Sequence, residues 1–238
     1  MIIALIGYGR MGHEIEEMAV SRGHVIKLII DKDNTDDLNE RNLKEVDVAI
    51  EFSSPDTAFK NISVCLGMKI PVVSGTTGWL KDFDTASDLC LKNETSFIHA
   101  SNFSIGVNLL FRLNGELARQ MEHYRNYSVS IEEIHHIKKL DAPSGTAIAL
   151  AEGIKKYHTG YTGWCSDNNK AEKSIPVRSI REGTIPGTHT VTWDSETDTL
   201  SLKHEARNRK GFALGAVISA EFIYGKKGIF TMNDVLGF

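Results

Sequence analysis

The sequence predicts an α/β protein in which a doubly wound parallel-sheet domain carries an inserted α+β domain with a mixed sheet. Three observations support this fold class. Short apolar runs alternate with helical stretches over residues 1–104, which is typical of βαβ units. A glycine-rich turn directly follows the first apolar run. Beyond it, runs that alternate polar and apolar residues indicate half-buried strands, two of them joined as an antiparallel hairpin.

Composition and charge exclude several classes of protein. Of the 238 residues, 41% are hydrophobic and 24% are charged, which is ordinary for a globular protein. The net charge of −4 gives no footprint for nucleic acid or a membrane surface. No run reaches the roughly 18 apolar residues of a membrane span. Cys65, Cys90 and Cys165 are too scattered for a disulfide framework, so we expect a cytoplasmic protein.

The parallel sheet is predicted from five apolar runs that alternate with helical patterns. The helices are expected at Arg10–Arg22, after Pro55 and from about Trp79, since proline suits the first helical turn. The strands are expected at Ile2–Ile6, Val25–Ile30, Val46–Phe52, Ile70–Ser74 and Ser96–Ala100.

The pattern changes after Asn102. A helical stripe covers Ile105–Tyr124 and a second, later one covers Gly211–Tyr224. Between them, the polar, glycine- and asparagine-rich region 160–173 is expected to be a mobile loop. Alternating residues predict strands at Tyr127–Glu132, His189–Trp193 and Leu200–His204, the last two joined by the polar turn Asp194–Asp198.

The glycine-rich turn predicts a dinucleotide site of the Rossmann type. Gly7 permits a tight turn, Gly9 allows the backbone to approach a pyrophosphate, and Gly12 allows close packing of helix and strand. The helix start adds N–H groups and a partial positive charge for phosphate. Asp31 ends the second strand, where a carboxylate binds the adenosine ribose, and Lys32 could face a 2′-phosphate. The pair suggests tolerance of both NAD and NADP.

Polar and small residues also follow the later strands of the predicted sheet. Ligands of doubly wound sheets lie beyond the carboxyl ends of the strands. Glycine and hydroxyl residues there can admit and hydrogen-bond a nicotinamide ribose. Each of these segments alone could be a plain turn, but together they favour a cleft; they are 52–54, 75–77 and 101–103.

The segment from Glu132 to Ala147, EEIHHIKKLDAPSGTA, predicts a site for a carboxylate. Ser144 is a good N-cap for the helix that follows, and the N–H groups of Gly145 and Thr146 would form an anion cup at its start. Upstream, Lys138 or Lys139 can neutralise a carboxylate or donate a proton.

The paired histidines of this segment favour acid–base chemistry over metal binding. His135 and His136 leave the predicted sheet at its edge, and imidazole can donate or accept a proton near neutral pH. Adjacent residues of a strand point in opposite directions, and no third ligand has a recognisable spacing. We therefore expect no metal site.

The sequence resembles one family closely, that of 4-hydroxy-tetrahydrodipicolinate reductase, formerly called dihydrodipicolinate reductase. The segment E-x-I-H-H-x-x-K-x-D-A-P-S-G-T-A at 132–147 is the signature of that family. Further matches cover almost the whole chain. They are G-R-M-G at 9–12, F-S-x-P at 52–55, G-T-T-G at 75–78, A-S-N-F-S-I-G-V-N at 100–108, R-x-G-x-x-P-G-T-H at 181–189 and H-E-A-R-N-R at 204–209.

The resemblance implies an oxidoreductase that uses NADH or NADPH to reduce a cyclic dicarboxylate. The reaction converts 4-hydroxy-tetrahydrodipicolinate to tetrahydrodipicolinate with loss of water, in the diaminopimelate route to lysine. It also implies a homotetramer assembled through the sheets of the inserted domain. The expected dinucleotide-binding domain comprises 1–104 and 209–238, and the expected substrate-binding and oligomerisation domain comprises 105–208.

The resemblance also implies roles for individual residues. By position, His135 matches the catalytic histidine of the family and Lys139 its proton-donating lysine, although the residues themselves leave the proton donor open between the two. His136 and the turn of Ser144, Gly145 and Thr146 match the substrate ligands. The implied cofactor contacts are Gly7, Tyr8, Gly9, Arg10, Met11, Gly12, Asp31, Lys32, Phe52, Gly75, Thr76, Thr77, Ala100, Ser101, Asn102 and Phe103.

The chain departs from the family pattern in two places. Many members carry G-x-x-G-R-M-G, one residue longer than the turn here, and the segment 31–46 is shortened. The first departure implies a tighter phosphate turn, and the second affects the adenosine-side contacts and the choice between NAD and NADP. Two other functions also fit the glycine turn, namely a different NAD(P)-dependent reductase or amino-acid dehydrogenase and a redox-sensing regulator. Neither explains the segment 132–147.

Overall fold

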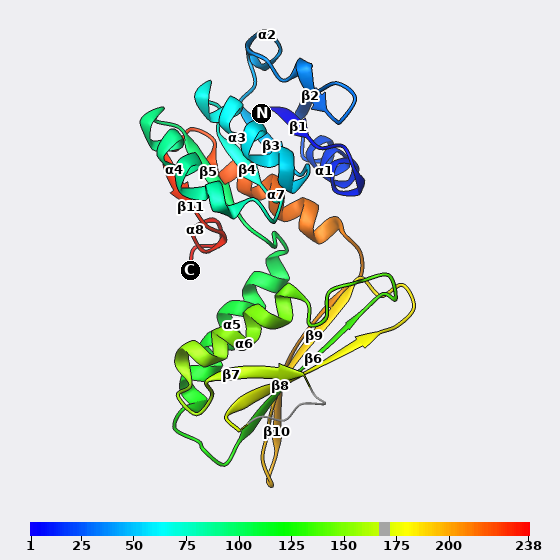
Figure 1. Ribbon diagram of the computed structural model, residues 1–238, viewed down its shortest axis with the longest axis vertical. Coiled ribbons are helices and arrows are strands. Elements are labelled where there is room, and N and C mark those ends of the chain that lie inside the picture. Colours follow the sequence, from blue (N-terminus) through cyan, green and yellow to red (C-terminus); the bar gives the residue numbers. More distant parts are fainter. Residues whose placement is uncertain (167–171) are drawn as a thin grey trace. The chain divides into compact units, whose positions relative to one another are not determined.

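The computed structural model describes residues 1–166 and 172–238, which form two compact units (Figure 1). The first unit joins Met1–Ile105 to Arg209–Phe238, and the second comprises Gly106–Asn208. Each unit has its own sheet.

The first unit is built on a six-stranded parallel sheet with the order β11-β5-β4-β3-β1-β2. Chain order reverses between β1 and β3, which makes the carboxyl ends of these two strands the switch point at which doubly wound sheets bind ligands. The predicted fold class is confirmed. The strands are β1 (Ile2–Ile6), β2 (Val25–Ile30), β3 (Val48–Glu51), β4 (Val72–Ser74), β5 (Ser96–His99) and β11 (Gly228–Phe230).

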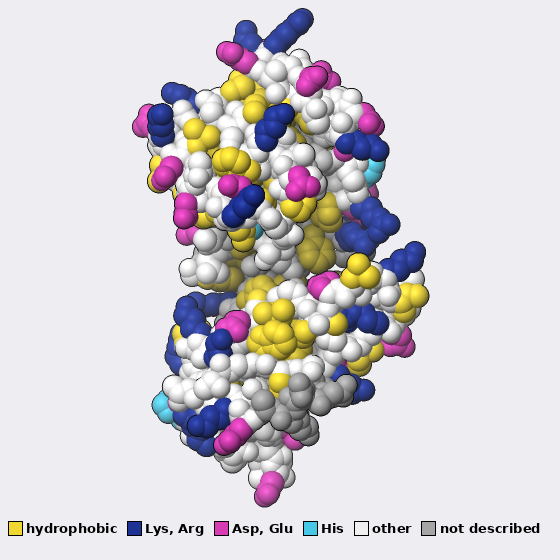
Figure 2. Space-filling model, in the orientation of Figure 1, with side chains coloured by type: hydrophobic (Ala, Val, Ile, Leu, Met, Phe, Trp, Pro, Cys, Tyr) yellow, Lys and Arg dark blue, Asp and Glu magenta, His cyan; other side chains and the backbone are white. Residues whose placement is uncertain are grey.

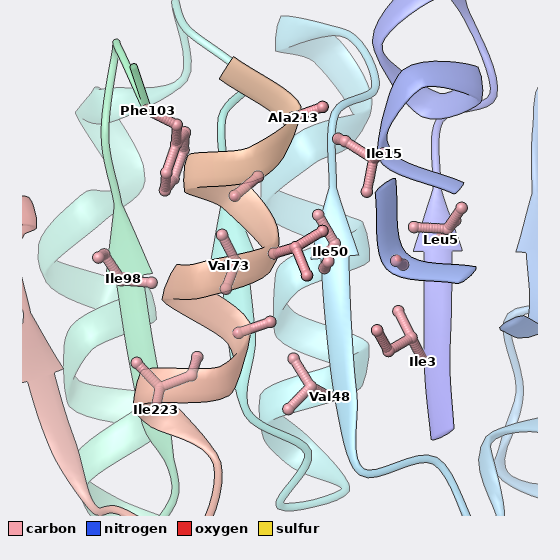
Figure 3. Packing of buried hydrophobic residues seen from close by; sticks show 14 of the residues in the cluster. Ile3, Leu5, Ile15, Val48, Ile50, Val73, Ile98, Phe103, Ala213 and Ile223 are labelled. Atoms are coloured by element: carbon pink, nitrogen blue, oxygen red, sulfur yellow. The ribbon is translucent and has the colours of Figure 1, made fainter. Parts of the chain in front are cut away.

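Helices cover both faces of this sheet because its strands are apolar on both sides. Ile3 and Leu5 of β1 enter one hydrophobic cluster, whereas Ala4 and Ile6 enter the other. The first cluster includes residues of α7, which lies over the strands in Figure 3. Its helices are α1 (Arg10–Ser21), α7 (Lys210–Ile223) and α8 (Met232–Leu236); those of the other are α2 (Glu40–Leu43), α3 (Pro55–Gly67) and α4 (Phe83–Lys92).

The second unit contains a five-stranded mixed sheet with the order β10-β9-β6-β8-β7. Along β6 every second residue is buried against α5 (Ile105–Met121) and α6 (Gly145–Tyr157), which supply the other half of the core. The predicted hairpin is confirmed, since β9 and β10 pair antiparallel. The strands are β6 (Ser128–His135), β7 (Gly163–Ser166), β8 (Ser174–Arg181), β9 (Gly187–Asp194) and β10 (Thr199–Ala206).

Part of the expected loop at 160–173 is a strand instead. Gly163–Ser166 forms β7, which pairs in parallel with β8 at the edge of the sheet. A four-residue edge strand needs only backbone hydrogen bonds to one neighbour, and a sequence this short gave no strand signal. Residues 167–171 of that expected loop lie outside the described residues.

Charged side chains of both signs lie on the surface of the molecule. On the face shown in Figure 2, acidic and basic side chains are interspersed. Within 1–166 and 172–238, no helix combines the length and the apolar character needed to cross a membrane.

Candidate active site

The turn after β1 has the geometry that a dinucleotide needs. Gly7 has φ +91°, and a Cβ on it would lie 2.1 Å from the carbonyl oxygen of Phe52. A Cβ on Gly12 would lie 2.4 Å from the carbonyl oxygen of Gly7, so both positions require glycine. A Cβ on Gly9 would meet no atom within 4 Å. The backbone at Gly9 is therefore open where a pyrophosphate would approach the start of α1, and the turn fits NAD(P)H.

Two cavities lie at the carboxyl ends of β1 to β4. The first extends from the glycine turn toward the end of β2, and the second extends toward the turn after β4. Phe52 and Ser53 line both of them. The first is also lined by Gly7, Tyr8, Gly9, Asp31, Lys32, Thr35, Ser54, Thr57 and Asn61, and the second by Gly9, Arg10, Met11, Pro55, Gly75, Thr76 and Thr77.

The structure brings most of the expected cofactor residues to these cavities, and Asp31 and Lys32 are among them. Asp31 and Lys32 are exposed at the end of β2, and the Asp31 N–H donates to Asn34 Oδ1 at 2.7 Å. The segment 100–103 follows β5, whose neighbour is β4. Phe103 is only 2% exposed and packs in the core against α7, so its side chain contributes to the fold.

In the second unit, His135 lies at the end of β6 beside Glu133. His135 is 7% exposed and the Glu133 side chain is fully buried. The ring Nδ1 of His135 lies in direct contact with Glu133 Oε2. Because an ionised carboxylate can only accept hydrogen bonds, this contact holds a proton on Nδ1 and orients the ring.

The second oxygen of Glu133 fixes two more parts of the site. Arg181 Nη2 donates to Glu133 Oε1 at 2.9 Å and to the carbonyl of Asp141 at 2.6 Å. The backbone N–H of Ser144 also donates to Glu133 Oε1, at 3.3 Å. One buried carboxylate thereby connects β6, β8 and the start of α6.

Electrostatics keep this carboxylate ionised. Burial acts to raise the pKa of Glu133, but hydrogen bonds from His135 and Arg181 outweigh it and hold the pKa well below its usual range. Burial lowers the pKa of nearby His189 to about 4, and the charge of His135 acts in the same direction. His189 is therefore neutral at pH 7.

Ser144 is the N-cap of α6, as predicted. Its hydroxyl accepts from the Ala147 N–H at 3.2 Å and lies 3.1 Å from His189 Nε2. Because the side chain is buried and committed to these contacts, Ser144 mainly fixes the helix start. The exposed Gly145 and half-buried Thr146 form the first turn, where the helix dipole favours an anion.

The lysine and the second histidine lie on the loop between β6 and α6. Lys139 Nζ forms an ion pair with Asp141, at 2.8 and 2.9 Å to its two oxygens. The hydrogen bond from Lys139 lowers the pKa of Asp141. The backbone N–H of His136 donates to the carbonyl of Ile185 at 2.8 Å, which anchors the beginning of the loop.

A glycine of β9 makes room for the ring of His135. A Cβ on Gly187 would lie 2.9 Å from His135 Nε2 and 3.3 Å from its Cδ2. The rings of His135 and His189 meet edge to face, with centroids 5.1 Å apart. The His135 ring is thus held between a carboxylate and a glycine.

Glu133, His135 and His189 also bring three potential metal ligands within 4.8 Å of one another. Sequence spacing did not reveal this group, because His189 comes from a different strand. Glu133 already accepts hydrogen bonds from Arg181 and Ser144, and it pairs with His135. These contacts favour a hydrogen-bonded network over a metal centre, and the expectation of no metal site remains a prediction.

Sequence reasoning missed three residues that shape the site, namely Glu133, Arg181 and His189. The signal for Glu133 was present, since it lies two residues before His135 and side chains of a strand alternate between faces. Arg181 and His189 come from other strands, so only the sheet order brings them together.

The parallel sheet and its glycine turn define a class, the NAD(P)-dependent oxidoreductases. Family models described as "Dihydrodipicolinate reductase, N-terminus" and "Dihydrodipicolinate reductase, C-terminus" match residues 1–103 and 106–236. The chain belongs to the dihydrodipicolinate reductase family.

Individual relatives agree with this membership. A 4-hydroxy-tetrahydrodipicolinate reductase of Christiangramia forsetii is 53% identical over 237 residues, covering 99% of this chain and 98% of the relative. One of Thermosipho africanus is 35% identical, with coverage of 99% and 98%. The solved dipicolinate-bound dihydrodipicolinate reductase from Paenisporosarcina sp. TG-14 has a TM-score of 0.82 at 24% identity and covers 98% of both chains, which shows the shared fold.

Proposed function

We infer that this protein catalyses the NAD(P)H-dependent reduction of 4-hydroxy-tetrahydrodipicolinate to tetrahydrodipicolinate, with loss of water, in the diaminopimelate route to lysine. Membership of the family and relatives of this activity along the whole chain support the reaction. The observation that carries it within the structure is the Glu133 carboxylate, which binds His135 and the Ser144 N–H together. An acid–base group and an anion-binding helix start are thereby fixed side by side.

The first unit is proposed to bind the reduced cofactor, which supplies the hydride. The open backbone at Gly9 and the cavities around it support this role. Asp31 is proposed to bind the adenosine ribose, and Lys32 the 2′-phosphate when NADPH is used. The other expected contacts, from Tyr8 to Phe103, are proposed as the remaining lining of the site, with Phe103 acting through the backbone around it.

The second unit is proposed to bind the dicarboxylate. The first turn of α6, with Gly145 and Thr146, would hold one carboxylate through its N–H groups and dipole. Lys139 and His136, on the loop before it, would contact the same substrate. Holding the ring at a fixed position beside His135 replaces a chance encounter with a near-attack arrangement.

A proton must reach the ring after hydride transfer, and we propose His135 as its source. Glu133 holds a proton on Nδ1 of His135, which leaves Nε2 as the position that exchanges a proton with substrate. Lys139 is paired with Asp141, so its proposed role is to neutralise the substrate carboxylate. Removal of each side chain separately distinguishes the two roles.

We further propose a cytoplasmic homotetramer that needs no nucleic acid or membrane. The mixed sheet has one face covered by α5 and α6, whereas Ser128 and Ser130 of β6 are exposed on the other. An open sheet face of this kind can pair with a second copy of the chain. Light scattering during size-exclusion chromatography should give four times the chain mass of 26.4 kDa, and a monomer would refute the tetramer.

The function is tested by following NADH and NADPH oxidation by the purified protein in a coupled assay. Dihydrodipicolinate synthase, supplied with pyruvate and aspartate semialdehyde, generates the unstable substrate. We expect oxidation of at least one cofactor that depends on all components, and inhibition by pyridine-2,6-dicarboxylate. Absence of oxidation with both cofactors would reject the proposed reaction.

A further inference from the structure

Glu51 is a fully buried carboxylate at the carboxyl end of β3, in the unit that binds the cofactor. Its Oε1 accepts from the Ser53 N–H at 2.9 Å, from the Thr76 hydroxyl at 2.8 Å and from the Ser53 hydroxyl. Its Oε2 accepts from the Ser74 hydroxyl at 2.7 Å. Within the described part of the chain, no Lys or Arg forms an ion pair with it. A carboxylate buried in this way is tolerated only because several donors converge on it.

Two of these donor residues come from the turns that line the cofactor cavities, and Ser74 is the last residue of β4. Ser53 lies in the turn between β3 and α3 and lines both cavities, and Thr76 lies in the turn after β4 and lines the second. The Ser53 N–H also donates to the Thr76 hydroxyl at 2.8 Å, so the two turns are bonded to each other as well as to Glu51.

The hydrogen bonds continue beyond these residues, and on one side they reach the wall of the first cavity. The Ser53 hydroxyl accepts from Thr57 at 3.1 Å and from Asn61 at 3.2 Å, and both of these residues line the first cavity. The Thr76 carbonyl accepts from Trp79 Nε1 at 2.8 Å and lies 3.0 Å from His99 Nε2. Thr76 is therefore fixed through its side chain and its backbone.

We propose that Glu51 is a positioning residue for the cofactor, which holds the turns after β3 and β4 in the shape that binds reduced dinucleotide. It acts through Ser53 and Thr76, since its own side chain is completely shielded from solvent. A carboxylate suits this position because it accepts at both oxygens and every neighbouring group donates. The inference rests on the proposed cofactor contacts of the first unit and adds to them a residue that touches no cofactor.

The test measures cofactor affinity apart from turnover. In Glu51→Gln, an NH₂ group that donates replaces one carboxylate oxygen that accepts, although the neighbouring groups of Ser53, Ser74 and Thr76 all donate to this side chain. In Glu51→Leu, both accepting oxygens are lost. We expect the Kd for NADH, measured by nicotinamide fluorescence, to rise about three- to tenfold in the first variant and more than tenfold in the second. At saturating NADH, kcat and the KM for the dicarboxylate should change less than about threefold.

A matched control separates positioning from general stability. Ser219→Ala removes a buried hydrogen bond, from the Ser219 hydroxyl to the Gly215 carbonyl, in the same unit but within α7. This variant should lower the thermal midpoint and leave the Kd for NADH unchanged. All affinities are measured well below the thermal midpoint, with folding checked by circular dichroism.

A double-mutant cycle tests the route of action. Thr76→Val removes the hydroxyl that donates to Glu51, so its effect on Kd should be less than additive with that of Glu51→Gln. Additive effects would overturn the proposed route. Should Glu51→Leu fail to fold, the cycle with Glu51→Gln decides the question.

Two outcomes overturn the inference in different ways. If Glu51→Gln folds and its Kd for NADH stays within twofold of the wild-type value, Glu51 has no positioning role. The proposed cofactor site itself would still stand. A wild-type protein that binds neither NADH nor NADPH removes the proposed site itself, and the role of Glu51 with it.

Discussion

At the scale of single residues, the site depends on carboxylates buried beneath the groups that act. Glu133 contacts and orients His135. The hydrogen bonds from His135 and Arg181 keep the Glu133 carboxylate ionised. The cost of burying such a charge is offset because each oxygen has its own donors. A neutral side chain at the same position would leave Arg181 unpaired and the imidazole free to rotate.

His135→Gln should lower kcat by about 10²–10⁴-fold, because the proposed proton donor is lost while the proposed binding groups remain. The Kd for NADH should stay unchanged. Steady-state kinetics and fluorescence titration measure the two quantities. A loss below about threefold would move the donor role to Lys139 or to water.

Lys139→Met should mainly raise the KM for the dicarboxylate. Lys138→Met, on the exposed neighbour, is the matched control.

Lys32→Met should raise the KM for NADPH by about tenfold and change the KM for NADH by less than twofold, because only NADPH carries the 2′-phosphate that this ammonium is proposed to bind. Asp31→Asn should act in the opposite sense and weaken NADH binding more. The measurement is a side-by-side comparison of kcat/KM for both cofactors. Equal effects of Lys32→Met on the two cofactors would show that Lys32 does not contact the 2′-phosphate.

At the scale of elements, β9 positions His135 as closely as β6 does, although it contributes no catalytic group. The strand carries Gly187 against the imidazole and His189 against Ser144. β9 pairs with β6 on one side and β10 on the other, so its backbone has little freedom to move. Any extra volume at Gly187 must therefore be absorbed by the ring.

Gly187→Ala should displace the His135 ring, since its Cβ would lie 2.9 Å from Nε2. We expect kcat to fall about 10- to 100-fold, with the Kd for NADH unchanged. Gly163→Ala in β7 is the matched control, because a Cβ there meets no atom within 4 Å. Wild-type turnover in Gly187→Ala would show that the ring tolerates the shift and would contradict this account of β9.

The elements with strong periodicity could be predicted from the sequence, and those held by pairing alone could not. The strands at Ile2–Ile6 and Val25–Ile30 were predicted with the bounds that the structure gives them. Three strands were missed, namely β7, β8 and β11. β7 and β11 are short edge strands, and β8 contains Pro176, so each has a weak local signal. The site shows the same division. His135 and Ser144 are visible in one segment, whereas Arg181 and His189 reach them only through sheet order.

At the scale of the whole molecule, stability should depend on pH through buried histidines. The pKa of His189 is about 4 in the folded state, below the value of about 6.5 for an unfolded chain. The unfolded state therefore binds the extra proton first as the pH falls. Stability is fully present above about pH 6.5 and is lost progressively toward pH 4, by about 3 kcal/mol at most from this residue.

His189→Gln should consequently flatten the dependence of unfolding free energy on pH between about 6.5 and 4. Urea unfolding at pH 7.5 and pH 5.0 measures the difference in wild type and variant. Some dependence should persist, since burial also lowers the pKa of His99, His158 and His204. Identical slopes in the two proteins would show that His189 is not protonated on unfolding in this range.

The position of α7 in the sequence has a consequence for biosynthesis. This helix contributes Ala213, Val217 and Ile223 to the core beneath the parallel sheet, yet ribosomes make it only after the entire mixed-sheet unit (Figure 3). During translation, one apolar face of the nascent sheet therefore stays only partly covered, by α1, until α7 has been made. The inserted unit, whose sequence is continuous, can close its own core earlier. We therefore expect the coenzyme to bind last, after α7 has packed against the sheet.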